Sequence, residues 1–227
     1  MPKTVTLLIS ASEPESAAIA AAIERAIQAS AAASGSLQYD RLQIKIVDLQ
    51  ALPAAPLLAS DILCPLTLAA VSTPNFPQHA LYKTCGDIEG LRARVSAQGY
   101  ATGAGNLWLP IVLTAKGPLY GEAIGQLDSG NFQQPVHLSD AQRQPLYRLG
   151  RWLLNDLGVP PAVYLLQMSC HESPKEHGVV FDRLWPFPAA PALASLGRQS
   201  PDLFTCHWRC LTHQPIRDLQ VRPQGRY

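Results

Sequence analysis

Apolar and polar positions follow two different periods along the first fifty residues. Residues 5–9 form a short apolar run, which is followed by a polar stretch at 10–16. Isoleucine then recurs every four residues over 19–27, which is the spacing of one buried helix face. Residues 42–47 return to an alternating pattern and predict a second strand. We therefore expect a βαβ unit in which the two strands are parallel and adjacent.

Over the rest of the chain, apolar runs typical of strands alternate with segments of helical periodicity. We expect a proline- and alanine-rich loop at 50–65, strands at 66–71, 107–115, 162–168 and 179–181, and helices at 80–98, 139–157 and 189–197. The turn at 116–118 predicts an antiparallel return after the strand at 107–115. This order predicts an α/β fold with a mainly parallel sheet. Residues 1–170 are expected to form the main domain, and residues 171–227 a C-terminal extension packed on it.

Composition narrows the class of protein further. Hydrophobic residues make up 47% of the chain and charged residues 15%, which favours a packed core over disorder. The net charge of +1 gives no general attraction to nucleic acid or to a membrane surface, so we predict neither as a partner. No stretch approaches the ~18–20 apolar residues of a membrane span. Five cysteines without a dense framework indicate a reducing compartment, so we predict a cytoplasmic protein.

The loop at 10–16 has the composition of an anion-binding loop. Ser10, Ser12 and Ser16 supply hydroxyl groups beside the unpaired N–H groups of a helix N-terminus, which suits a phosphate. The alternative is a capping box formed by Ser12 and Glu15, with no ligand. Glu13 and Glu15 favour the alternative, since both add negative charge to the first turn.

Three stretches of the first 90 residues resemble successive landmarks of the NAD(P)H-dependent FMN reductases: LLISASEPESAAIAAAI, IKIVDLQALPAAPLLASDI and VSTPNFPQHALYKTCGD. The resemblance implies a flavodoxin-like, Rossmann-like strand order and an FMN cofactor. It places the FMN phosphate at Ser10, Ser12 and Ser16. It also implies a loop beside the isoalloxazine, formed by Thr73, Pro74, Asn75 and Phe76. The chain would then be a flavin- or nucleotide-binding protein, with FMN-dependent oxidoreductase activity supplied by the flavin.

The C-terminal half resembles a second family. LPIVLTAKGPLYGEAIG, AVYLLQM and VVFDRLWPFPAAPALASLG follow the element order of the C-terminal lobe of ATP-grasp proteins. In that family Glu-x-Asn on the last strand binds Mg²⁺; here Asp182 matches the acidic position and Leu184 replaces the Asn. The resemblance implies a degenerate, non-catalytic binding or assembly protein. Residues 184–196 are apolar enough for a protein-partner surface, provided that the core does not cover them.

Cysteine and histidine gather in two short segments, 170–177 and 206–213. Zinc sites usually pair their ligands over short spacers, and no second closely spaced cysteine pair accompanies Cys206 and Cys210. We therefore predict no metal site and expect these cysteines in the core. The spacing assigns neither a catalytic residue nor an oligomeric state.

Overall fold

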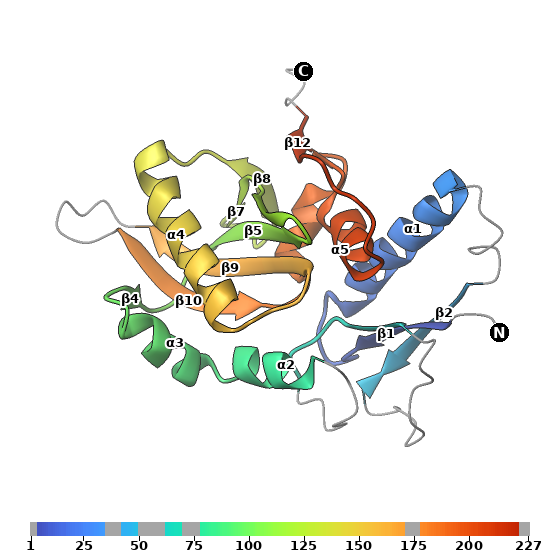
Figure 1. Ribbon diagram of the computed structural model, residues 1–227, viewed down its shortest axis with the longest axis horizontal. Helices are drawn as coiled ribbons and strands as arrows, with labels where there is room; N and C mark the ends of the chain where they lie inside the picture. The colour runs from blue at the N-terminus through green and yellow to red at the C-terminus, as the bar shows by residue number, and fades with distance from the viewer. Residues whose placement is uncertain (1–3, 35–41, 50–61, 70–77, 171–177, 223–227) are drawn as a thin grey trace.

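Two separate β-sheets organise the computed structural model, which describes residues 4–34, 42–49, 62–69, 78–170 and 178–222 (Figure 1). The predicted βαβ unit is confirmed in the smaller sheet. β1 (Thr4–Ile9) lies between β2 (Gln43–Asp48) and β3 (Ile62–Pro65), and both neighbours are parallel to it. α1 (Ser16–Ser34) connects β1 to β2 and buries its isoleucine face.

The third strand differs from its predicted position. It occupies Ile62–Pro65, inside the segment expected as a loop, and the described residues 66–69 that follow it are not a strand. A run of four residues next to prolines has no alternation that distinguishes a strand from a loop. Its pairing with β1 decides the structure instead, and the N–H of Leu66 still donates to Leu8 O at 2.8 Å.

The larger sheet has seven strands within the described residues and is almost entirely antiparallel. Its order is β4-β10-β9-β5-β7-β8, with β6 paired to β5. The strands are β4 (Ala101–Thr102), β5 (Leu107–Thr114), β6 (Gly117–Tyr120), β7 (Ala123–Gln126), β8 (Phe132–Val136), β9 (Ala162–Cys170) and β10 (Val179–Trp185). Among these strands, β4 alone runs parallel to its neighbour.

The prediction of one mainly parallel, flavodoxin-like sheet is therefore wrong. The order β2-β1-β3 agrees with it, but the chain then leaves that sheet and builds a second one. The connections from β5 to β6 and from β9 to β10 are shorter than the dozen or so residues that a parallel crossover needs, so these strands return antiparallel. The predicted antiparallel partner of the strand at 107–115 is confirmed as β6.

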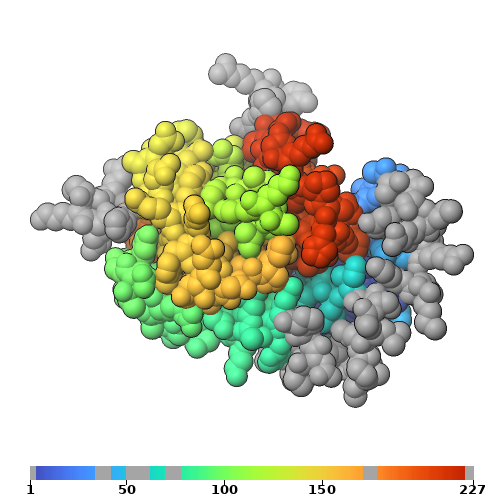
Figure 2. Space-filling model, in the orientation of Figure 1, coloured from blue at the N-terminus to red at the C-terminus, as the bar shows by residue number. Residues whose placement is uncertain are grey.

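Helices cover both faces of the large sheet. α3 (Ile88–Ser96) and α4 (Asp140–Asp156) pack on one face, which we call the closed face, and Figure 2 shows α4 side chains spread over it. α5 (Leu203–Leu211) and the 3₁₀ helix η2 (Ala190–Ser195) pack on the other, the cavity face, with α1 beyond α5 (Figure 1). α2 (His79–Gly86) lies at the edge between them, and β11 (Gln199–Ser200) pairs with β12 (Gln220–Val221).

Helix boundaries agree with the sequence where capping signals are strong. Ser139 and Gln142 form a capping box at the start of α4, which confirms the helix predicted over 139–157. The helix predicted over 80–98 is divided at Asp87, whose carboxylate accepts a hydrogen bond from Gly90 N at 3.0 Å and caps α3. None of the helices in the described ranges is long and apolar enough to cross a membrane.

The predicted domain division at residue 170 falls between β9 and β10. These two strands pair along most of their length, so both predicted parts contribute to the large sheet. α5 and η2, which also belong to the C-terminal part, pack between that sheet and α1. The division itself stays a prediction.

Candidate functional site

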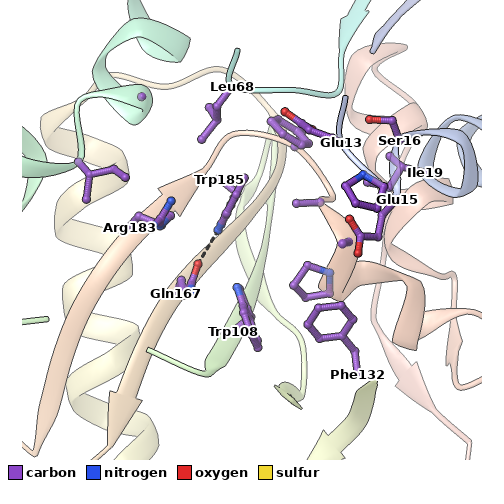
Figure 3. A pocket seen from close by; sticks show the side chains of 17 residues that line it. Glu13, Glu15, Ser16, Ile19, Leu68, Trp108, Phe132, Gln167, Arg183 and Trp185 are labelled. Carbon is purple, nitrogen blue, oxygen red and sulfur yellow. Dashed lines mark hydrogen bonds between the residues drawn. The ribbon is translucent and has the colours of Figure 1, made fainter. Parts of the chain in front are cut away.

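A cavity of about 570 Å³ lies between the start of α1 and the large sheet (Figure 3). Four aromatic side chains form much of its wall: Trp108, Phe132, Trp185 and Phe187. Ile19 of α1 and Leu68 also line the cavity. The volume lies within the range of roughly 300–1,000 Å³ that is typical of small-molecule pockets. The two sheets therefore meet around a space that suits a small organic ligand.

Three residues on neighbouring strands form a row across the sheet side of this cavity. Gln167 of β9 is the register partner of Trp108 on β5 and of Arg183 on β10. Opposed residues in antiparallel strands lie about 4.5–5.5 Å apart at Cα. All three side chains line the cavity, so an indole, a carboxamide and a guanidinium lie side by side.

A β-bulge in β10 determines which side chains of this strand reach the cavity. The register with β9 shifts at Asp182, and a bulge of this kind redirects the side chains that follow it. Arg183 and Trp185 line the cavity, whereas Leu184 is buried on the closed face. The Asp182 carboxylate accepts a hydrogen bond from Arg92 Nη2 of α3 at 2.7 Å. The acidic residue of the strand therefore lies away from the cavity.

The carboxamide of Gln167 is occupied by two hydrogen bonds. Its Oε1 accepts from Trp185 Nε1 at 2.9 Å (Figure 3), and its Nε2 donates to Gly105 O at 2.7 Å. Gly105 lies so close to β9 that a Cβ there would be 2.6 Å from the Cα of Met168. A glycine is therefore required for this close approach. Gln167 positions Trp185 and the loop before β5.

Arg183 retains unused hydrogen-bond donors. Its Nε lies 3.3 Å from Asp182 Oδ1, and its guanidinium lies over the Trp185 ring, 5.6 Å from the centroid. Neither terminal amino group donates to a protein acceptor within the described residues. Asp182 also pairs with Arg92, which in turn contacts the exposed Glu89, so one buried carboxylate is shared by two guanidinium groups. A planar guanidinium with free amino groups is suited to bidentate contact with an acid group.

The indole N–H of Trp108 is a second unused donor. Trp108 is 5% exposed, and its Nε1 has no hydrogen-bond partner in the described part of the chain. The nitrogen lies on the edge of the ring that faces Gln167 and Trp185 (Figure 3). An unpaired buried donor costs about 1–3 kcal/mol, which an acceptor on a ligand would recover. Trp208 Nε1 and Gln134 Oε1 are also unpaired, but neither residue lines the cavity.

The predicted phosphate loop reaches the cavity through one of its serines. Ser16 lines the cavity, and its hydroxyl donates to Ser10 O at 2.8 Å. The hydroxyls of Ser10 and Ser12 bond to each other at 2.7 Å, and neither residue lines the cavity. The other predicted flavin contacts, Thr73, Pro74, Asn75 and Phe76, lie outside the described residues. FMN binding by this loop stays a prediction.

The predicted capping box of Ser12 and Glu15 is wrong, because α1 begins later. Ile19 N donates to Glu15 O at 3.0 Å, so Glu15 takes the N-cap position. Glu13 accepts a hydrogen bond from Thr67 Oγ1 at 2.6 Å, which ties the loop to the segment after β3. Glu13 and the exposed Glu15 both line the cavity, on the side of α1.

These residues do not fit a Mg²⁺ site. Asp182 is bonded to Arg92, Leu184 is fully buried on the closed face, and neither lines the cavity. In the described ranges no group of three or more His, Cys, Asp or Glu side chains is arranged to hold a metal ion. Mg²⁺ requires near-octahedral oxygen ligands, and the guanidinium of Arg183 opposes a second cation nearby. The positions implied by the ATP-grasp resemblance thus carry an ion pair and a core leucine.

Cys206, His207 and Cys210 of the 206–213 segment lie in the core, whereas His213 is exposed. Burial lowers the pKa of His207 to about 3, and its Nδ1 accepts a hydrogen bond from Val163 N at 3.2 Å. Burial also raises the pKa of Cys210 to about 12 and raises that of Cys206 above its ordinary value. Their sulfurs contact different backbone carbonyls, those of Leu113 and Pro201. These groups are packed as apolar and hydrogen-bonded core residues.

The segment 184–196 is largely covered. Most of its side chains are buried, and η2 packs against α1, α5, β7 and β8. The condition for an exposed partner surface is therefore not met, because the core and the cavity wall use these apolar groups. A protein partner at this segment is not shown.

Sequence analysis did not identify Trp108, Gln167 or Arg183 as site residues. A signal existed in the two strands: Gln167 interrupts AVYLLQM and Arg183 interrupts VVFDRLW, both of which are otherwise mostly apolar. A long polar side chain in a buried strand needs a partner or a cavity. The register that brings these two residues beside Trp108 is a tertiary feature and cannot be read from spacing.

The fold defined by these two sheets is ATP-grasp-like. It is similar to that of glycinamide-RNase-transformylase T from Mycobacterium tuberculosis, with a TM-score of 0.64 and 18% identity over 94% of this chain and 80% of that one. N5-carboxyaminoimidazole ribonucleotide synthetase from Thermotoga maritima gives a TM-score of 0.65 and 8% identity over 97% of this chain and 78% of that one. An N5-carboxyaminoimidazole ribonucleotide synthetase solved as an ADP complex gives 0.67 and 10% over 97% and 79%.

These similarities extend the ATP-grasp resemblance from the C-terminal half to nearly the whole chain. They support that resemblance and not the one to FMN reductases. At such low identity they show the fold alone. Neither a protein-family model nor a curated protein matches the sequence.

Proposed function

We propose that this chain is a small-molecule-binding protein on an ATP-grasp-like scaffold, and that it holds its ligand in the cavity without Mg²⁺-dependent phosphoryl transfer. The observation that carries the proposal is a pair of unused donors in an aromatic-walled cavity. These are the terminal amino groups of Arg183 and Nε1 of Trp108. Trp108 Nε1 is a buried polar atom, and such atoms are normally paired, with exceptions expected where function requires them. The Arg183 side chain is 28% exposed, and it lines the cavity.

The shape of the site supports a small molecule over a macromolecule. The polar groups converge on one concave space, and aromatic and aliphatic side chains supply most of the lining. Few polar groups in a mainly apolar cavity are typical of sites that fix the orientation of an organic ligand. The absence of a fitting carboxylate set on β9 and β10 supports the metal-free part of the proposal.

Nucleotides and flavins remain ligand classes to be tested. One similar enzyme was solved as an ADP complex, and aromatic walls suit a planar base. For FMN, the serine hydroxyls of the predicted loop are engaged with one another and with the backbone. ADP and FMN are therefore included among the ligands that are tested for binding.

The test is a ligand-observed NMR screen of an aromatic and heteroaromatic fragment set together with ADP and FMN, in the presence of EDTA. Wild type is compared with a variant that fills the cavity, Ala190→Trp, because Ala190 lines it and is only partly buried. The matched control is Ala93→Trp on an exposed position of α3. Circular dichroism confirms that each variant is folded.

We expect a subset of the panel to bind wild type and Ala93→Trp and to lose binding to Ala190→Trp. If no fragment binds wild type, the proposal is wrong. Equal binding to the filled variant would place any ligand elsewhere and would also contradict it. Binding that requires Mg²⁺ would contradict its metal-free part.

A further inference from the structure

We infer that the ligand of this cavity is an aromatic carboxylate, whose acid group binds Arg183 and Trp108 and whose ring packs among the aromatic side chains. This inference rests on the proposed function and assigns the chemical class of its ligand. The guanidinium takes the role that a metal ion would have in neutralising an acid group, so binding needs no divalent cation.

The donors on the sheet side favour an acid group. Arg183 is held by Asp182 at Nε and by the face of Trp185, which leaves both terminal amino groups for an anion. Trp108 contributes a neutral N–H from two strands away in the same row. Gln167 lies between them, but both ends of its carboxamide are occupied. A carboxylate can accept from a guanidinium with one or both oxygens and still accept from an indole.

The charges around the cavity favour a monoanion over a phosphate dianion. The acidic side chains that line it are Glu13 and Glu15 on the side of α1, facing the sheet residues across the cavity (Figure 3). Arg92 and Arg183 share the one buried carboxylate of Asp182, so the two guanidinium groups exceed it by one positive charge. A second charge on the ligand would remain uncompensated beside these two carboxylates, and like charges at such range repel. The same reasoning disfavours a nucleoside diphosphate without its metal.

The walls favour a planar ring. Trp185 and Phe187 meet edge to face with centroids 6.0 Å apart, and Trp108 and Phe132 meet in the same way at 5.3 Å. Such pairs present ring faces and edges on which another aromatic ring can pack. Ile19 and Leu68 add aliphatic surface to the wall. A ring between these walls leaves its acid substituent near the row of polar residues.

The experiment uses three probes with the same ring: 2-naphthoate, its neutral amide 2-naphthamide, and 2-naphthyl phosphate. Their affinities are measured by isothermal titration calorimetry with wild-type protein, once in EDTA and once in Mg²⁺. The test variants are Arg183→Gln and Trp108→Phe. Arg94→Gln and Trp152→Phe are the controls, because Arg94 pairs with Asp156 on the surface and neither residue lines the cavity.

We expect wild type to bind naphthoate about 10- to 100-fold more tightly than naphthamide, as a charge-assisted contact predicts. Naphthyl phosphate should bind more weakly than naphthoate, and EDTA should change neither value. Arg183→Gln should reduce naphthoate affinity to that of the amide while leaving the amide unchanged. Trp108→Phe should weaken naphthoate by about 2- to 10-fold. Both controls should match wild type.

Equal affinity of wild type for naphthoate and naphthamide would overturn the inference and leave the proposed function standing. Tighter binding of the phosphate, or a requirement for Mg²⁺, would also overturn it. If neither these probes nor any fragment of the screen binds, the proposed function fails as well. The comparison of acid with amide uses wild-type protein, so it decides the matter even if a variant does not fold.

Discussion

The two faces of the large sheet use their polar groups in different ways. On the closed face, Asp182 is paired with Arg92 and accepts a further hydrogen bond from Gly105 N at 3.0 Å, among fully buried aliphatic side chains. On the cavity face, Arg183 and Trp108 keep donors that no acceptor among the described residues uses. Asp182 and Arg183 are adjacent in one strand, yet the carboxylate is paired inside the fold and the guanidinium lines the cavity.

The difference between the two faces shows which part of the ATP-grasp resemblance holds for this chain. The scaffold is retained, but the strand position that the resemblance assigned to a metal ligand is an internal ion pair. The side chain that faces the cavity beside it is a cation. A fold does not carry its function with it, and our proposal for this cavity therefore rests on its own residues.

The largest expected effect comes from the closed face. Leu166→Ala removes a fully buried side chain from β9 and should lower the free energy of unfolding by about 2–5 kcal/mol, since the packed neighbours close the space only partly. Urea denaturation measures the change. The control is Leu127→Ala, because Leu127 is 46% exposed and should cost less than about 0.5 kcal/mol. Similar effects for the two variants would contradict the described core.

Asp182→Ala tests the ion pair on the same face. It leaves the Arg92 guanidinium without its buried carboxylate, and we expect a loss of about 2–3 kcal/mol. The value lies below that of a fully buried pair because the Arg92 side chain is 22% exposed. Asp156→Ala breaks the exposed pair with Arg94 and should cost about 0–1 kcal/mol. If Asp182→Ala were no worse than this control, the pair would have no structural role.

A third prediction concerns a polar group that packs with the cavity face but is fully buried. Burial lowers the pKa of His207 to about 3 from an ordinary value of 6.5, so the unfolded chain takes up a proton first as pH falls. The contribution of His207 to the free energy of unfolding should be constant above about pH 6.5. As the pH decreases from about 6.5 to 3, the free energy of unfolding should fall by up to about 1.4 kcal/mol per pH unit. Urea unfolding at a series of pH values measures the slope.

His207→Asn is the matched variant for this slope. The Asn side-chain oxygen can accept the hydrogen bond from Val163 N that Nδ1 now accepts, and the side chain does not titrate. The variant should have a flatter pH profile than wild type below pH 6.5. An unchanged slope would mean that His207 is not the group responsible.

Sequence analysis predicted the local features and missed those that depend on tertiary pairing. The βαβ start, α4 and the β5–β6 hairpin follow from periodicity and turn residues over short distances. The split into two sheets does not, because it depends on which distant strands pair. The bulge at Asp182 cannot be read from the sequence either, and it changes the alternation so that Phe181 and Leu184, three residues apart, both pack on the closed face.

The candidate site illustrates the same limit. Of the predicted residues in the described ranges, Ser16 reaches the cavity, whereas Ser10 and Ser12 do not line it. The row of Trp108, Gln167 and Arg183 comes from β5, β9 and β10, and Trp108 and Arg183 lie 75 positions apart in the sequence (183 − 108). The register of the paired strands brings these residues together, and their spacing in the sequence does not predict it.

The most direct test of the central claim is an indole ¹H–¹⁵N NMR titration with 2-naphthoate. The chain has four tryptophans, and the resonance of Trp108 is assigned with Trp108→Phe. We predict that the Trp108 N–H shifts downfield on binding because it gains an acceptor. The Trp185 N–H, already bonded to Gln167, should change less, and those of Trp152 and Trp208 should not move. An unmoved Trp108 resonance at saturating naphthoate would contradict the assignment of the cavity face as a binding site.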